Sequence, residues 1–178
     1  MNLRLATLED AEAIAALHTA SWRSTYGSVL STAYLEQSVP SERRAVWDQR
    51  LASPKANQCV VIVERETVVV GFACVFAAEH AQWGSYLDNL HVSSALQKQG
   101  VGTALIAAVA QWCELQAPGR GLYLSVNQSN ITAQQFYYRL GARSAESSVW
   151  NAPDGSTVPT FWFVWESVVP LAAKAANG

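Results

Sequence analysis

The feature that most constrains this chain is a strand followed by a glycine-containing polar loop and an apolar helix. Residues 83–92 are predicted to form a strand, residues 93–100 are polar, and an apolar stripe with helical spacing begins at Val101. The first turn of a helix has backbone N–H groups without partners, and glycine lets phosphates approach the backbone closely. A pyrophosphate cradle is therefore predicted at consecutive residues: Gln97, Lys98, Gln99, Gly100, Val101, Gly102 and Thr103.

Two common nucleotide fingerprints do not fit this loop. A dinucleotide-binding turn needs a third glycine, but Leu105 occupies that position when the count starts at Gly100. A phosphate loop of the Walker type needs a Gly-Lys-Ser or Gly-Lys-Thr sequence after a spacer, and the stretch has neither. Taken alone, the two glycines are equally compatible with a loop that binds no ligand.

The rest of the chain predicts one mixed α/β domain. Helices are expected over residues 7–27, over a stretch from Ser31 that is interrupted at Pro40 and restarts at Ser41, and over 101–117 and 130–140. Strands are expected at 2–6, 58–64, 67–78, 121–126, 143–151 and 158–166. The strand at 67–78 is apolar on both faces and should lie in the centre of the sheet. The domain is expected to span 1–166, with a C-terminal tail at 167–178.

The composition argues against several classes of protein. The formal net charge is −2 and no basic stripe occurs, so nucleic-acid binding is not expected. The N-terminus lacks the apolar segment of a signal peptide, and no apolar run reaches the roughly 18 residues that a membrane span needs. The three cysteines, Cys59, Cys74 and Cys113, fit no metal or redox motif, so no metal site is expected. They are expected to be buried thiols in a reducing cytoplasm.

Two motifs, in sequence order, resemble those of the GNAT superfamily of N-acetyltransferases. Gln97-x-x-Gly100-x-Gly102 resembles the family's Q/R-x-x-G-x-G/A, and residues 130–142 resemble its N-x-x-A-x-x-F-Y-x-x-x-G-F. The chain departs from the family pattern at Ser94, Gln99 and Ala142. The resemblance covers residue 2 to about 166 and implies a GNAT-like fold of the mixed α+β class. In that fold helices flank a central, mostly antiparallel sheet whose middle strands splay apart.

The resemblance implies an enzyme that transfers an acetyl group from acetyl-CoA to a primary amine of a small molecule or a protein N-terminus. The amine loses a proton and attacks directly in a ternary complex, and the CoA thiolate leaves with help from an acid. Tyr137, four residues before Gly141, then points at the thioester sulfur as a cofactor contact and the general acid, and Asp88 on strand 83–92 is the general base. Aromatic packing beside Phe136 is the other interpretation of Tyr137. Two other interpretations of Asp88 stay open, namely a surface carboxylate and an anchor for the substrate amine.

The same resemblance implies further contacts to the cofactor. Asn130 is expected to contact the pantetheine arm, although its position also suits a helix N-cap. The backbone groups of Leu90 and Val92 are expected to pair with pantetheine in the manner of a strand edge. Such pairing requires strands 83–92 and 121–126 to splay apart, often at a bulge.

The acceptor pocket is predicted around the first helix and the last hairpin, where relatives of this family vary most. Trp22 and Tyr26, one turn apart on the same face, are the leading pocket candidates, and Asn89 is expected to orient a substrate. Core packing is the other interpretation of most of the seven tryptophans. His91 is predicted to face away from Asp88 in a regular strand and to have a structural role.

A second class of function stays open beside the enzyme. A non-catalytic acyl-CoA sensor on the same fold would keep the Gly100–Gly102 cradle and would tolerate loss of the acid. The presence of Tyr137 favours the enzyme. Many relatives form dimers, so the tryptophan-rich hairpin is also open to interpretation as a homodimer interface.

Overall fold

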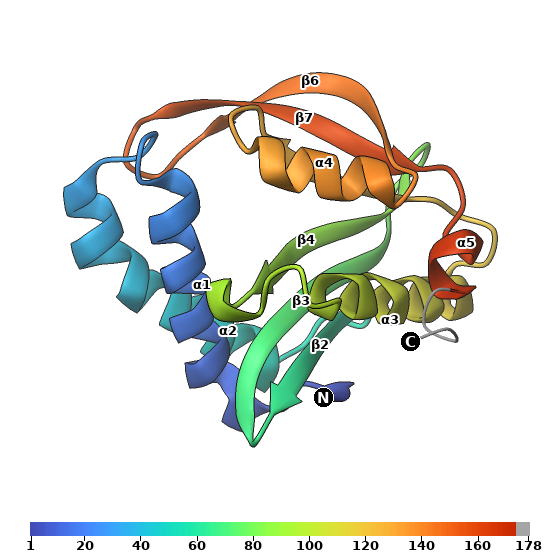
Figure 1. The fold of residues 1–178 in the computed structure, drawn as a ribbon, viewed down its shortest axis with the longest axis horizontal. Helices are drawn as coiled ribbons and strands as arrows, with labels where there is room; N and C mark the ends of the chain where they lie inside the picture. Colours follow the sequence, from blue (N-terminus) through green and yellow to red (C-terminus); the bar gives the residue numbers. More distant parts are fainter. Residues whose placement is uncertain (174–178) are drawn as a thin grey trace.

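The chain folds around one sheet of seven strands, in the order β1-β2-β3-β4-β5-β7-β6 (Figure 1). The structure is a computed structural model that describes residues 1–173. The strands are β1 (Asn2–Leu5), β2 (Gln58–Arg65), β3 (Val68–His80), β4 (Gly84–Val92), β5 (Leu122–Asn127), β6 (Arg143–Asn151) and β7 (Thr157–Trp165). Neighbouring strands are antiparallel except β4 and β5, which run parallel. The sheet is therefore the mostly antiparallel one that the sequence predicts.

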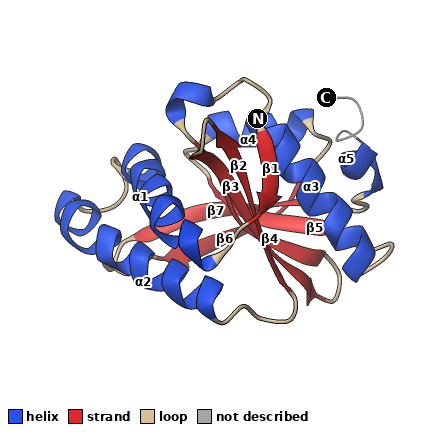
Figure 2. Cartoon of the chain, turned by 90° about the horizontal axis from the view of Figure 1, so that it is seen from below, coloured by secondary structure: helices blue, strands red, loops and turns tan. Residues whose placement is uncertain are grey.

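Helices cover both faces of the sheet (Figure 2). They are α1 (Ala11–Tyr26), α2 (Val39–Ala52), α3 (Val101–Gln116), α4 (Ile131–Arg139) and α5 (Val169–Ala172). The helices α1 and α2 pack on one face, where Ile14 and Trp47 share a buried cluster with Phe72. On the other face Leu105 of α3 shares a second cluster with Val75. Within residues 1–173, no helix is both long and apolar enough to cross a membrane.

The strand β3 lies in the centre of this arrangement, as its double apolar pattern predicts. Phe72 belongs to the cluster under α1 and α2, whereas Val75 belongs to the cluster under α3. Gly71 lies where α3 begins, and a Cβ atom at this position would come within 2.9 Å of Cγ1 of Val101. A glycine at this point therefore lets the first turn of α3 pack directly on the sheet.

The strands β4 and β5 splay apart, as predicted. They are paired at only two positions, both near the start of each strand. A bulge lies beside the opening, because Cys74 of β3 is opposite Asn89 while the next residue, Val75, is opposite Leu87. Asp88 is thus an extra residue in β4, and it bends the strand away from a regular ladder.

Two boundaries differ from the sequence prediction. A π-helical turn, η2 (Tyr34–Ser38), runs directly into α2, so the chain is not interrupted at Pro40. Pro40 is the second residue of α2, and the π-helical turn before it shifts the hydrogen-bond pattern by one residue, with the Val39 N–H bonded to the Tyr34 carbonyl. The expected tail begins with α5, which places the fully buried Val168 and Leu171 in the core. The packed chain therefore extends beyond residue 166.

Candidate functional site

The candidate site lies at the opening between β4 and β5, where α3 begins. The sequence predicts the same role for two glycines there, and the structure gives them different ones. Gly100 has a left-handed φ of +84°, and no described atom lies within 4 Å of where its Cβ would be. A Cβ on Gly102 would lie 3.2 Å from Cζ of Phe136, so this glycine lets α3 pack closely against α4. Gly100 faces open space, and Gly102 serves helix packing.

The start of α3 presents free backbone donors. Among the described residues no side chain caps this helix, whose N-cap residue is Gly100. The N–H groups of residues 101–103 precede the first intrahelical bond, which Ala104 donates to the Gly100 carbonyl at 3.0 Å. The preceding residues, 97–100, are exposed, and Lys98 also has a left-handed φ. The positive end of a 16-residue helix with unused N–H groups is suited to an anion.

Helix α4 positions Asn130 and Tyr137 at the same opening. The Oδ1 atom of Asn130 accepts a hydrogen bond from the N–H of Ala133 at 3.1 Å, so the residue is an N-cap, and its amide NH2 has no partner among residues 1–173. The Tyr137 ring is 8% exposed and packs against Phe163 and Trp165. Burial raises the pKa of the Tyr137 phenol well above its usual value, so this hydroxyl keeps its proton at neutral pH.

Asp88 has a fixed cationic partner that the sequence alone does not reveal. Its Oδ2 atom accepts a hydrogen bond from Nη1 of Arg50, on α2, at 2.6 Å. Nδ2 of the neighbouring Asn89 donates to the same oxygen. The structure therefore brings Asp88 and Asn89 together on β4 and holds the carboxylate by ionic and polar contacts.

The prediction that His91 faces away from Asp88 is wrong, and the bulge is the reason. Alternation in a regular strand would place the two side chains on opposite faces. The extra residue at Asp88 shifts the alternation, so both side chains point toward α1 and α2. The Asp88 carboxylate bonds to Arg50, and Nδ1 of His91 lies 2.7 Å from Oγ of Ser21, on α1.

His91 belongs to a pair of imidazoles that the sequence analysis does not detect. The rings of His91 and His18 have centroids 4.5 Å apart. Nδ1 of the buried His18 accepts a hydrogen bond from Nε1–H of Trp47 at 3.0 Å. Burial, with a smaller contribution from the Arg43 charge, lowers the pKa of His91 to about 4. Burial also lowers the pKa of His18, so both rings are neutral at pH 7.

The predicted acceptor residues form part of an aromatic cluster between α1 and the last hairpin. The Trp22 ring lies 5.3 Å from Tyr26 and 5.7 Å from Trp150 of β6, measured between centroids. The guanidinium of Arg43, on α2, lies 4.6 Å from the Trp22 ring centroid. The spacing of Arg43, Trp47 and Arg50 along one helix face is the sequence signal that could have indicated these positions.

The hairpin of β6 and β7 is held over the N-terminal helices. Figure 1 shows it arching across the molecule to reach the region after α1. Oδ2 of Asp154, in the hairpin turn, accepts a hydrogen bond from the N–H of Ser31 at 2.8 Å. Ala152 and Val158 of the hairpin share a buried cluster with Trp22. The α1–α2 unit, β4 and the hairpin therefore surround one side of the opening.

Comparison with known proteins identifies this arrangement. Residues 14–142 match the acetyltransferase (GNAT) family. The chain belongs to this family. The uncharacterized N-acetyltransferase YuaI of Bacillus subtilis is 29% identical over 63% of this chain and 64% of its own. The uncharacterized N-acetyltransferase MJ1530 of Methanocaldococcus jannaschii is 26% identical over 67% of this chain and 68% of its own.

Solved structures share the GNAT fold at low sequence identity. A GCN5-related N-acetyltransferase of Rhodopseudomonas palustris has a TM-score of 0.72 at 21% identity, covering 92% of this chain and 93% of that one. The PaiA N-acetyltransferase of Thermoplasma acidophilum, solved in complex with coenzyme A, has a TM-score of 0.68 at 15% identity, covering 89% and 96%. YncA of Salmonella typhimurium, solved with its cofactor acetyl-CoA, has a TM-score of 0.65 at 16% identity, covering 93% and 92%.

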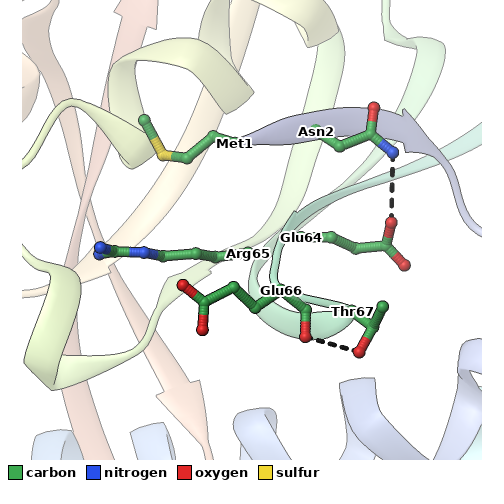
Figure 3. A pocket seen from close by; sticks show the side chains of 6 residues that line it. All are labelled: Met1, Asn2, Glu64, Arg65, Glu66 and Thr67. Carbon is green, nitrogen blue, oxygen red and sulfur yellow. Dashed lines mark hydrogen bonds between the residues drawn. The ribbon is translucent and has the colours of Figure 1, made fainter.

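A separate open hollow of about 550 Å³ lies elsewhere on this GNAT domain (Figure 3). It is lined by Met1, Asn2, Glu64, Arg65, Glu66 and Thr67. These residues belong to the β1 edge of the sheet and to the turn between β2 and β3, not to the β4–β5 opening. The candidate site is at the splay, where β4 and β5 separate and α3 begins.

Proposed function

We propose that this protein transfers an acetyl group from acetyl-CoA to a primary amine. The observation that carries the proposal is the convergence of three features at the β4–β5 opening. They are the uncapped start of α3, the protonated phenol of Tyr137 and the carboxylate of Asp88. The CoA and acetyl-CoA bound to the solved relatives from Thermoplasma acidophilum and Salmonella typhimurium support the choice of donor.

The loop before α3 and the edge of β4 would hold the donor. The N–H groups of Val101, Gly102 and Thr103 would bind its pyrophosphate, together with the exposed loop residues Gln97, Lys98, Gln99 and Gly100. The open space at Gly100 fits such a ligand, because no side chain there blocks the backbone. The main chain of Leu90 and Val92 would pair with the pantetheine arm, and the free amide NH2 of Asn130 would donate to it.

The chemistry is a direct transfer in which two side chains move protons. The amine nitrogen forms a bond to the thioester carbonyl carbon while the carbon–sulfur bond breaks. Asp88, which is paired with Arg50, receives the proton that the ammonium loses, through a bridging water. Tyr137 gives its proton to the departing thiolate, and the second proton that the nitrogen loses as the amide forms restores the phenol. Trp22, Tyr26 and Asn89 would contact the acceptor.

Thiol release from acetyl-CoA across a panel of amines tests the proposal. Tyr137→Phe should lower kcat by about a hundredfold or more, because the donated proton is lost, while acetyl-CoA affinity stays the same. Tyr138→Phe is the matched control, since this neighbouring ring is 51% exposed and should leave the rate unchanged. Equal rates for wild type and Tyr137→Phe would remove Tyr137 from the mechanism.

The base needs its own pair of variants, because the bulge brings His91 to the same side of β4 as Asp88. Asp88→Asn should lower kcat/KM by about a hundredfold or more, and His91→Gln should leave it nearly unchanged. The opposite result would transfer the role of base to His91, which is neutral at pH 7.

A non-catalytic acyl-CoA sensor is the alternative function on the same fold. Tight acetyl-CoA binding in calorimetry, without thiol release from any amine in the panel, would favour it over the enzyme. A reducing compartment suits either function, because Cys59, Cys74 and Cys113 are all free and buried, as predicted. We also propose that the packed acetyltransferase domain includes α5. A homodimer formed through the tryptophan-rich hairpin would sediment at twice the mass of one chain.

A further inference from the structure

Helix α2 carries two arginines, two turns apart, with contrasting surroundings. Arg50 forms a close ion pair with Asp88, with 2.6 Å between Nη1 and Oδ2. The ion pair of Arg43 within the described chain, to Glu42, spans 3.9 Å. That carboxylate already accepts a hydrogen bond from the Tyr34 hydroxyl at 2.6 Å. Arg43 therefore lacks the close anionic partner that Arg50 has.

The Arg43 side chain is also largely withdrawn from solvent. It is 16% exposed, and its Nε atom is buried without a hydrogen-bond partner among residues 1–173. An unpaired buried donor is unfavourable, more so on a charged group. The guanidinium therefore has hydrogen-bonding capacity that the described fold does not use.

The contacts of Arg43 suit a planar anion. Its guanidinium carbon lies 4.6 Å from the centroid of the Trp22 ring, a cation–π contact. A carboxylate binds a guanidinium in its plane, through two parallel N–H donors, and the described residues give Arg43 no such bidentate partner. A lysine at this position would offer a point charge without those two parallel donors.

Arg43 lies close to the part of β4 where the amine would react. The Trp22 ring that Arg43 contacts lies 5.6 Å from the His18 ring, and the His18 ring lies 4.5 Å from that of His91 on β4, measured between centroids. An acceptor carboxylate held by Arg43 would therefore lie near the part of β4 that carries Asp88 and His91.

We propose that Arg43 binds a carboxylate of the acceptor, and that the acceptor is an amino acid. In a free amino acid the carboxylate is attached to the carbon that bears the amine. Arg43 would hold this carboxylate while the amine reacts near Asp88 on β4. One carboxylate would give Arg43 the close anionic partner that Glu42, at 3.9 Å, does not provide. The inference rests on the proposed acetyl transfer for its chemistry and on Arg43 alone for its specificity.

The test compares amino acids with their amides, which lack the carboxylate. Affinity is measured by calorimetry with CoA present, so that it does not depend on turnover, and thiol release is measured with acetyl-CoA. In wild type the acids should bind about ten- to a hundredfold more tightly than the amides. Arg43→Gln should abolish this difference, and Arg43→Lys should restore only part of it. Arg44→Gln, which removes the same charge from an exposed neighbour paired with Asp48, should preserve it.

The outcomes separate this inference from the proposed function. Equal binding of acids and amides by wild type, or a preference that survives Arg43→Gln, would overturn the carboxylate subsite. Acetylation of amides as fast as acids would overturn it while leaving acetyl transfer intact. Acid-selective binding that needs Arg43, without any thiol release, would support the subsite and refute the transferase. Thermal unfolding of each variant shows whether it is folded.

Discussion

Acid should destabilise this protein through its two buried imidazoles. Burial holds His91 neutral and lowers its pKa from 6.5 to about 4. The unfolded chain binds this proton below pH 6.5, whereas the folded chain binds it only near pH 4. The free energy of unfolding is therefore fully retained above pH 6.5 and falls as the pH drops through this window. His18 is shifted in the same direction and adds to the loss.

The size of the effect follows from the shift. One pKa unit corresponds to about 1.4 kcal/mol, so His91 alone should remove about 2 kcal/mol by about pH 5. The carboxylate of Asp10 does not contribute in this range. Arg4 lowers the pKa of that group from 3.8 to about 2, so its contribution is lost only in stronger acid. The two processes therefore occupy separate pH windows.

Urea unfolding, followed by tryptophan fluorescence at constant ionic strength, measures this loss at several pH values. His91→Gln keeps a polar group near Ser21 but removes the titration, so the pH dependence should become shallower. His80→Gln is the control, because its ring lies outside the imidazole pair and accepts backbone N–H groups of its own turn. A free energy that stays constant from about pH 6.5 to about pH 5 would refute the reasoning.

Three further variants test other features of the structure. Gly100→Ala should weaken acetyl-CoA binding in calorimetry and should also cost roughly 1–2 kcal/mol of stability, because its φ is left-handed. Gly119→Ala, with a similar φ and open surroundings, should cost a similar amount of stability without affecting binding. Leu171→Ala should lower the free energy of unfolding in urea by about 2–5 kcal/mol, and a negligible loss would exclude α5 from the core. Asp154→Ala removes the acceptor for the Ser31 N–H and should lower Tm by a few degrees; an unchanged Tm would show that this bond does not hold the hairpin.

The sequence predicts the architecture well because periodicity and breakers decide most of it. The double apolar pattern of β3 reflects burial on both faces, and the polar loop ending at Gly100 marks the start of α3. Boundaries are less predictable where tertiary contacts decide them. The helix α5 is too short for its pattern to be read, and it forms because Val168 and Leu171 find room in the core.

The side chains around the acceptor are the part that the sequence does not reveal. A bulge is a property of two paired strands, so the extra residue at Asp88 cannot be seen in β4 alone. His91 is consequently predicted to face the wrong side. The partners of Asp88 and His91 come from α2 and α1, far away in the chain, and only the folded structure brings Arg50 and Ser21 to them.

The buried cluster that joins α1 to the last hairpin has a consequence for how this protein can evolve. Trp22 contributes both to the predicted acceptor wall and to the packing of the hairpin. A smaller residue at position 22 would admit a bulkier acceptor, but it would also weaken the packing between α1 and the β6–β7 hairpin. A substitution of Trp22 that accommodates a new substrate would therefore lower the stability of the protein. Stabilising changes elsewhere in the core should precede such a substitution.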